Sequence, residues 1–344
     1  MDVEVKNRLR MRLRSHRRNL RRHLHRASAF LVKCQIREPY VVRGLLRGTV
    51  CPWEIGVMEP YGFTLQEDFH DTLEAMWVWT YYTKVSKRPT FVENIQAGWK
   101  YVTANFERFV PTNQAIQGYY DCAQLLHTST LYDDVFADKS YRRWMDIAGN
   151  RLAWYLSTLR PARGREYSDP WWMTVCLAGA AKQVGNHGWK EVAQQFVNRT
   201  ILRSKQPFRL IEKEPRHRGP GGHDFFSQNA TKIQALLACT PTKEELEDLL
   251  INTILPLTPT QFVARRTDEN AWNASVAAAL GKCFAVTRSP EFLQRYFAIM
   301  DELQQRDEQQ SAALPRDTRT LVRESWVTYF YARAYTAVLS PSIP

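Results

Sequence analysis

Two kinds of helical pattern alternate along the chain from about residue 64 onward. One set is nearly uncharged and rich in Ala, Gly, Cys and Leu, as in "WMTVCLAGAAKQ" and "ASVAAALGKCFAV". The other set has one apolar stripe and one charged face, as in "KEELEDLL". A helix that is apolar all round is buried, whereas a helix with a single apolar stripe lies at a surface. The pattern therefore predicts buried inner helices that alternate with solvent-facing outer helices.

The nearly uncharged set recurs at a sustained spacing. The predicted inner helices start every 45 to 54 residues and cover 65–84, 118–136, 169–185, 223–239, 268–285 and 318–338. Breaks such as "KRPT", "ACTPT" and "TRSP" supply a proline or a hydroxyl cap between helices. A repeat of this length is typical of stacked helical hairpins. We predict an all-α fold, an (α/α)6 toroid over residues 64–344, with an open solenoid as the alternative.

Two further segments precede the repeats. Residues 1–26 contain ten Lys or Arg against two acids, so most of the net charge of +12 lies there. Leucines spaced by four residues predict a basic amphipathic helix, an arm that either packs on the main domain or binds nucleic acid or an anionic surface. Residues 27–63 are the least helical stretch, and "YVVRGLLRGTV" predicts a short β-hairpin packed on the toroid.

Composition limits the class of protein further. Hydrophobic residues make up 44% and charged residues 24%, which is typical of a globular chain. No apolar run is long enough to span a bilayer and the start lacks a signal-peptide pattern, so we expect a cytoplasmic protein. The cysteines are scattered without a CxxC pair, which favours reduced thiols over disulfides or a metal site, and no cofactor is expected. They are Cys34, Cys51, Cys122, Cys176, Cys239 and Cys283.

The starts of the predicted inner helices share a carboxylate beside an aromatic or amide side chain, as in "DENAWN" and "RESWV". Capping of free N–H groups explains the acids but not the aromatic rings. Because the inner helices of a toroid run parallel, their first turns converge on one mouth. Rings that stack on a sugar and acids that bind hydroxyls form a carbohydrate cleft, and this is the function predicted for the mouth. The alternative is that the rings plug the mouth as core.

The candidate residues come from all six openings. The candidate catalytic carboxylates are Asp68, Asp121, Asp169, Asp224 and Asp268. The candidate substrate-binding residues are His70, Tyr119, Tyr120, Trp171, Trp172, His223, Asn270, Trp272, Glu324 and Trp326. Glu67, Asp71 and Glu269 belong to the same openings. Asp169 and Asp224 are favoured because neighbouring rings would raise a carboxyl pKa.

Over about residues 64–340 the sequence resembles the six-hairpin glycosidase superfamily and its polysaccharide-lyase relatives. The resemblance rests on the hairpin repeat and the acid-plus-aromatic openings, without a family-specific motif. It implies a glycan substrate held at the inner-helix mouth and a pair of carboxylates that act as acid and base. Hydrolysis of a glycosidic bond uses one protonated and one ionised carboxyl group across the scissile bond.

Three alternatives remain open at this point. A lyase acting on uronic-acid glycans would use His223, His70 or Tyr120 as base, and Arg265 and Arg266 would bind the substrate carboxylate. The string "LYDDVFAD" places three acids in a DDxxxD arrangement that resembles the Mg²⁺-binding acids of class I terpene synthases. They are Asp133, Asp134 and Asp138, and the first two would lie at the far end of their helix. The third alternative is a non-enzymatic helical adaptor with a plugged mouth and an anion-binding arm.

Overall fold

The computed structural model describes residues 2–35, 40–42, 45–47, 68–110, 116–159, 169–203, 225–239, 243–264, 268–307, 310–315 and 323–339. The inner helices are α2 (Asp68–Ser86), α4 (Ile116–Phe136), α6 (Asp169–Val184), α8 (Phe225–Cys239), α10 (Glu269–Thr287) and α12 (Ser325–Ala337). The outer layer contains α1 (Val3–Cys34), α3 (Val92–Phe109), α5 (Arg142–Thr158), α7 (His187–Val197), α9 (Lys243–Asp248) and α11 (Pro290–Arg306). Helix α7 continues as η1 (Asn198–Leu202), and α9 continues as η2 (Leu249–Ile254) and η3 (Leu255–Leu257).

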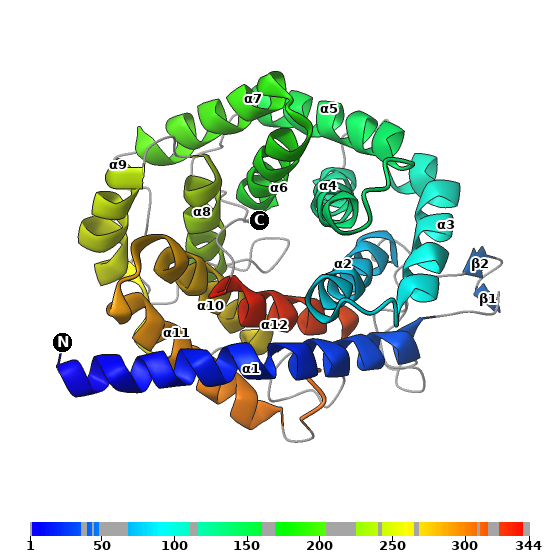
Figure 1. Cartoon of the computed structure of the whole chain (residues 1–344). Coiled ribbons are helices and arrows are strands. Elements are labelled where there is room, and N and C mark those ends of the chain that lie inside the picture. The colour runs from blue at the N-terminus through cyan, green and yellow to red at the C-terminus, as the bar shows by residue number, and fades with distance from the viewer. Residues whose placement is uncertain are drawn as a thin grey trace.

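The inner helices form a closed ring (Figure 1). Each of them contacts the next in chain order, and α12 contacts α2, which completes the circle. The outer helices surround this ring (Figure 1). The predicted (α/α)6 toroid is therefore confirmed, and the open solenoid is excluded because its two end helices would not meet.

Burial separates the two layers as the residue pattern predicts. In α10 nearly every side chain from Glu269 to Ala285 is buried, including those of Asn273, Ser275 and Lys282. In α11 the buried residues recur at three- and four-residue spacing from Phe292 to Leu303, so only one face is covered. Small residues allow the inner helices to crowd together. A Cβ added at Gly281 of α10 would lie 2.9 Å from the backbone nitrogen of Val338, just beyond the end of α12.

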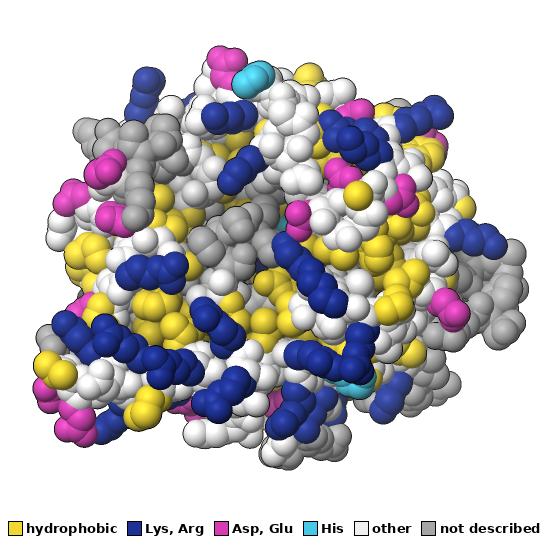
Figure 2. Space-filling view, in the orientation of Figure 1, with side chains coloured by type: hydrophobic (Ala, Val, Ile, Leu, Met, Phe, Trp, Pro, Cys, Tyr) yellow, Lys and Arg dark blue, Asp and Glu magenta, His cyan; other side chains and the backbone are white. Residues whose placement is uncertain are grey.

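The basic N-terminal segment is an outer helix of the ring. Helix α1 contacts α2, α11 and α12 and passes residue 26 to end at Cys34. Its buried face includes Leu9, Leu20, Leu24 and Leu31, while Lys and Arg side chains gather over the helix on the face shown in Figure 2. The contacts favour the interpretation of this segment as a helix packed on the main domain. Binding of nucleic acid or an anionic surface, and the remaining domain boundaries, stay predictions.

Two histidines dock α1 onto α12. The rings of His16 and His23 both stack on Tyr335, with ring centroids 3.8 and 3.9 Å away. His16 Nε2 also lies 2.8 Å from the backbone oxygen of Tyr335. Burial lowers the pKa of His16 to about 4 and that of His23 to about 3. Both rings are therefore neutral at the α1 interface near neutral pH.

The predicted β-hairpin and the predicted reduced cysteines can also be compared with the structure. Strands β1 (Tyr40–Val42) and β2 (Leu45–Arg47) pair antiparallel, within the segment where a short hairpin is predicted. Residues 48–63 lie outside the described part, so the packing of this segment on the toroid stays a prediction. The described cysteines are free and buried, in accord with reduced thiols, and Cys51 lies outside the described residues.

Among the helices that the structure describes, none is both long enough and apolar enough to cross a bilayer.

Gly149 of α5 gives a test of the packing between neighbouring outer helices. A Cβ at this position would lie 2.3 Å from the Trp189 ring of α7, which must then move. We expect Gly149→Ala to lower the free energy of unfolding by about 1–3 kcal/mol, as overpacking does. Urea unfolding measures it. The matched control is Gly188→Ala, where the nearest atom lies at an ordinary 3.5 Å, and an equal loss there would contradict the packing argument.

The docking of α1 predicts a pH-dependent stability. The unfolded His23 binds a proton below its ordinary pKa of 6.5, whereas the folded one does so only near 3, so stability is complete above 6.5 and is lost as the pH falls. Between about pH 7 and pH 5, His23 should account for a loss of about 2 kcal/mol. We expect His23→Phe to remove this share of the loss, measured by urea unfolding at both pH values. The exposed Met11 of the same helix is the control, since Met11→Phe adds the same ring without removing a titrating group and should leave the slope unchanged.

Candidate functional site at the N-terminal mouth of the ring

Polar side chains from α2, α4 and α12 meet where these three helices begin. His70 and Asp71 lie in the first turn of α2, Asp121 lies near the start of α4, and Ser325 is the first residue of α12. The Ser325 hydroxyl donates to Asp71 Oδ2 at 3.2 Å. His70 Nδ1 lies 3.0 Å from Asp121 Oδ1. These contacts show that the N-terminal ends of the three helices share one mouth.

His70 lies between two carboxylates. Its Nδ1 contacts Asp121, and its Nε2 lies 3.6 Å from Asp71 Oδ1. The side chain of His70 is 12% exposed, and those of the two aspartates are 2% exposed. One ring nitrogen thus faces each acid, at hydrogen-bond distance for Asp121 and at a longer distance for Asp71. We call Asp71, Asp121 and His70 the acid cluster.

Burial sets the protonation of Asp121. Desolvation raises its pKa to about 6, and this outweighs the hydrogen bond and the charge of His70, which act in the opposite direction. A carboxyl group with a pKa near 6 is protonated in a useful fraction of molecules under mildly acidic conditions. Asp121 therefore keeps a proton at a higher pH than an exposed aspartate does, and the sequence-based prediction that named it depended only on its place at a helix start.

Glu74 of α2 lies one turn below His70 and supports the acid cluster. Its Oε1 accepts hydrogen bonds from Gln124 Nε2 at 2.8 Å and from the Tyr120 hydroxyl at 3.3 Å. Burial raises the pKa of Glu74 well above its ordinary value. Its other oxygen is buried and has no hydrogen-bond partner among the residues that the structure describes. Both observations indicate that Glu74 is a neutral carboxylic acid. Its hydrogen bond holds the Tyr120 hydroxyl in place, and the Tyr120 ring packs edge-to-face against the ring of His70.

Aromatic rings fill the centre of the ring below these acids. Tyr329 of α12 donates to Gln124 Oε1 at 3.3 Å and lies 2.9 Å from His127 Nδ1. The buried guanidinium of Arg333 lies 3.9 Å from the centroid of the Trp172 ring. Trp172, predicted to line the cleft, is thus part of the core. Here the alternative of an aromatic plug is the better description.

Two further predicted rings face the outer layer rather than the mouth. Tyr119 stacks on Tyr155 of α5 with ring centroids 4.0 Å apart. The Trp171 indole N–H donates to Thr200 of η1, and the amine of Lys232 lies 4.4 Å from its centroid. Both rings pack between neighbouring helices, so neither takes the position expected of a substrate-binding residue.

A half-buried aromatic group lies beside the acid cluster, at the starts of α10 and α12. The centroids of Trp272 and Trp326 are 6.2 Å apart, and Phe330 packs against both. The Trp326 indole N–H donates to Glu324 Oε2, which orients the ring and the acid together. This hydrogen bond is a structural reason for the acid beside a tryptophan at the start of the last inner helix. Trp272, Trp326 and Tyr120 are the predicted rings that remain partly exposed.

Polar residues at the start of α10 are engaged in contacts with neighbouring segments. Glu269 forms an ion pair with Arg306 of α11, with 2.5 Å between Oε1 and Nη1. Asn270, predicted to bind substrate, donates to the backbone oxygen of Pro315 at 2.8 Å. Asp268 precedes the helix in a left-handed conformation, with φ of 54°. These partners give Asn270 a structural role.

Several predicted residues lie outside what the structure describes. They are Glu67, Asp224, His223, Arg265 and Arg266, and the side chains of Asp68 and Asp169. Asp68 and Asp169 are the first residues of α2 and α6. Their predicted roles as catalytic or substrate-binding residues stay predictions.

The acids of the DDxxxD arrangement lie at the end of α4, which is the opposite end from the acid cluster. Asp134 pairs with Lys84 at the end of α2, with 2.6 Å between Oδ2 and Nζ. Asp138 accepts hydrogen bonds from Ser140 and Tyr132. Within the described ranges, no three His, Cys, Asp or Glu side chains gather as a metal site. Asp134 and Asp138 serve the helix ends here, so they add no support to the terpenoid-synthase alternative.

Sequence reasoning missed Glu74, Gln124 and Ser325 and did not place Asp71 among the catalytic candidates. A signal for the first two exists in the sequence. Glu74 lies four residues after His70, and Gln124 lies four residues after Tyr120, so each shares a helix face with a predicted residue. A polar residue inside an otherwise apolar inner helix is conspicuous, because burying it without partners is costly.

No family model and no curated protein matches this chain. Among solved structures, the chain is similar to an unsaturated glucuronyl hydrolase specific for heparin. The sequences are 14% identical, the TM-score is 0.54, and the match covers 95% of this chain and 96% of that one. At this identity the similarity establishes the toroid fold over nearly the whole length.

The protonation of Glu74 can be tested by substitution. We expect Glu74→Gln to keep the free energy of unfolding within about 1 kcal/mol, because a neutral amide oxygen still accepts from Gln124 and Tyr120. Glu74→Leu should lower it by about 1–3 kcal/mol or more, because buried donors lose their acceptor. Urea unfolding at neutral pH measures both, with the exposed Glu244→Gln as control. A loss for Glu74→Gln as large as for Glu74→Leu would show that the carboxylate is ionised.

Proposed function

We propose that the chain is a carbohydrate-active enzyme that hydrolyses a glycosidic bond at the N-terminal mouth of the ring. The observation that carries the proposal is the acid cluster, in which two carboxyl groups from adjacent inner helices flank one histidine. Hydrolysis needs a group that gives a proton to the leaving oxygen and a group that receives one from water. Asp121 and Asp71 are suited to these two tasks because their surroundings differ.

Asp121 is the proposed proton donor. Its pKa of about 6 keeps a protonated fraction available, and His70 holds the carboxyl group by a 3.0 Å contact. Asp71 is the proposed ionised partner, since it accepts the hydroxyl hydrogen bond of Ser325 and lies near His70 Nε2. It would receive the proton of the attacking water. His70 is a positioning residue in this scheme, because it sets the orientation of both acids.

Trp272 and Trp326 are the proposed sugar-binding rings. They are partly exposed, they lie at the starts of the inner helices, and Glu324 fixes the indole of Trp326. Aromatic faces of this kind stack on the apolar face of a sugar while nearby acids bind its hydroxyls. The rings and the acid cluster together supply the two properties that a glycan site requires.

The structural similarity guides the choice of substrate. The similar protein is named as an unsaturated glucuronyl hydrolase specific for heparin, so the first substrates to test are heparin-derived oligosaccharides that end in an unsaturated glucuronyl residue. A panel of neutral and saturated glucuronyl oligosaccharides should accompany them. Loss of the unsaturated uronate indicates hydrolysis there, and appearance of a new unsaturated sugar indicates the lyase alternative.

Asp121→Asn should lower kcat/KM on the best substrate of this panel by at least about 10²-fold, the range that general acid catalysis contributes. In the wild type, kcat/KM should fall as the pH rises through about 6, because Asp121 then loses the proton it must donate. The residual kcat/KM of the variant should not show this fall as the pH rises through about 6. Stopped assays of product release across pH measure both effects.

Asp146 of α5 provides the matched control, because it is a half-exposed acid that pairs with Arg142 on the outer layer. Asp146→Asn should leave kcat/KM and its pH profile unchanged. Equal activity of Asp121→Asn and wild type on a turned-over substrate would refute the role of Asp121. Absence of turnover and of binding across the whole panel would instead favour the helical adaptor.

A further inference from the structure

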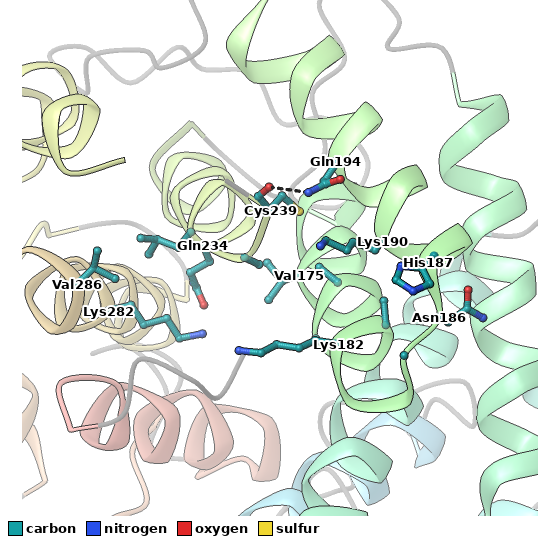
Figure 3. Close-up of a pocket in the computed structure, with 16 residues that line it drawn as sticks. Val175, Lys182, Asn186, His187, Lys190, Gln194, Gln234, Cys239, Lys282 and Val286 are labelled. Atoms are coloured by element: carbon teal, nitrogen blue, oxygen red, sulfur yellow. Dashed lines mark hydrogen bonds between the residues drawn. The ribbon is translucent and has the colours of Figure 1, made fainter. Parts of the chain in front are cut away.

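A cavity lies at the end of the ring opposite the acid cluster. It has a volume of about 430 Å³ and is lined by the last turns of α6, α8 and α10 and the start of α7 (Figure 3). Its walls include the apolar side chains of Val175, Leu237 and Val286. A space of this size accommodates a small organic molecule rather than a water or a single ion.

Lysines give this cavity its charge. Lys182, Lys190 and Lys282 all line it, and the described lining residues include no Asp or Glu. We call these three residues with Gln234 the lysine pocket. Figure 3 shows the amines of Lys182 and Lys282 pointing toward one another across the cavity, beside Gln234. Two like charges directed at one space favour a shared anion between them.

Lys282 is the informative member of the lysine pocket. It is only 8% exposed, yet among the described residues its amine has no hydrogen bond and no ion pair. Burial lowers its pKa well below the ordinary value, and the charge of Arg333 acts in the same direction. The stem of Lys282 is buried while its amine reaches the cavity, where a positive charge at so little exposure is costly unless an anion lies beside it. A bound anion would supply the missing partner and would reverse both effects.

Compensation of the helix dipole accounts for Lys182 but not for Lys282. Lys182 lies in the last turn of α6, where a positive charge complements the helix dipole and remains exposed to solvent. Lys282 lies more than one turn before the end of α10 and is buried, so capping does not explain it. Arg333, a buried cation whose charge acts on Lys282, is already engaged, because it donates to Gln234 Oε1 at 2.9 Å.

We propose that the lysine pocket binds a small phosphorylated organic molecule, with its phosphate between Lys282 and Lys182. More than one amine converges there, which suits a doubly charged group, and lysine binds phosphate as a point charge. The volume beyond the phosphate and the apolar walls accommodate an organic part. This second site is separate from the mouth, and it does not depend on glycan hydrolysis.

The test uses the intact chain with glucose 6-phosphate, inorganic phosphate and glucose as probes, in isothermal titration calorimetry. Glucose 6-phosphate should bind, inorganic phosphate should bind more weakly, and glucose should not bind. Lys282→Met should weaken the binding of glucose 6-phosphate by at least about tenfold, the equivalent of one charge-assisted contact. Lys182→Met, which changes an exposed side chain and leaves the fold intact, should also weaken it.

Lys100 on the outer helix α3 is the matched control, since its side chain is exposed and lies away from the cavity. Lys100→Met should bind glucose 6-phosphate as the wild type does. Unchanged affinity in both Lys282→Met and Lys182→Met would overturn the proposal, and so would a wild type that binds neither phosphate probe. Binding that appears only in a chain ending at residue 339 would also overturn it, because the chain's own terminus would then occupy the pocket.

Discussion

The contact of α12 with α2 closes the ring, and the other features of the structure depend on that closure. A closed ring of helices leaves little room at its centre, so inner helices must approach one another closely. Gly281 permits this approach at the turn after α12, where any Cβ would meet backbone atoms. Closure also brings residues near both ends of the chain together, as the hydrogen bond from Ser325 to Asp71 shows. The acid cluster itself comes from α2 and α4, and closure adds the Ser325 hydroxyl of α12 as a hydrogen-bond donor to Asp71.

The same closure forces polar groups at the centre of the ring to find partners among themselves. Glu74, Gln124 and Tyr329 form a chain of hydrogen bonds that joins α2, α4 and α12. Arg333 extends the polar interior toward α8 through Gln234. A buried network of this kind is stable when its members are satisfied, and it fixes how the helices are rotated relative to one another. The acids at the mouth thereby rest on a rigid base.

Parallel inner helices place acids such as Asp71 and Asp121 near their starts, where the backbone dipoles favour negative charge. Lys84 and Lys182 lie in the last turns of α2 and α6, whereas α4 ends with Asp133 and Asp134. Asp121 and Lys282 depart from simple dipole compensation, because both are buried and both have a pKa shifted toward the neutral form by desolvation. Groups of this kind are concentrated at functional sites.

The sequence by itself determined the layer to which each helix belongs, because composition decides whether a helix is buried all round or on one face. It also determined that His70, Asp121, Glu324 and Trp326 lie at one mouth, since parallel inner helices place their first turns together. Only the tertiary structure decided which neighbours face each other. Tyr119 and Tyr120 are adjacent in the chain, yet one packs on α5 and the other reaches Glu74. Successive helical residues point about 100° apart, so their roles depend on the rotation of α4 against its neighbours, which long-range packing sets.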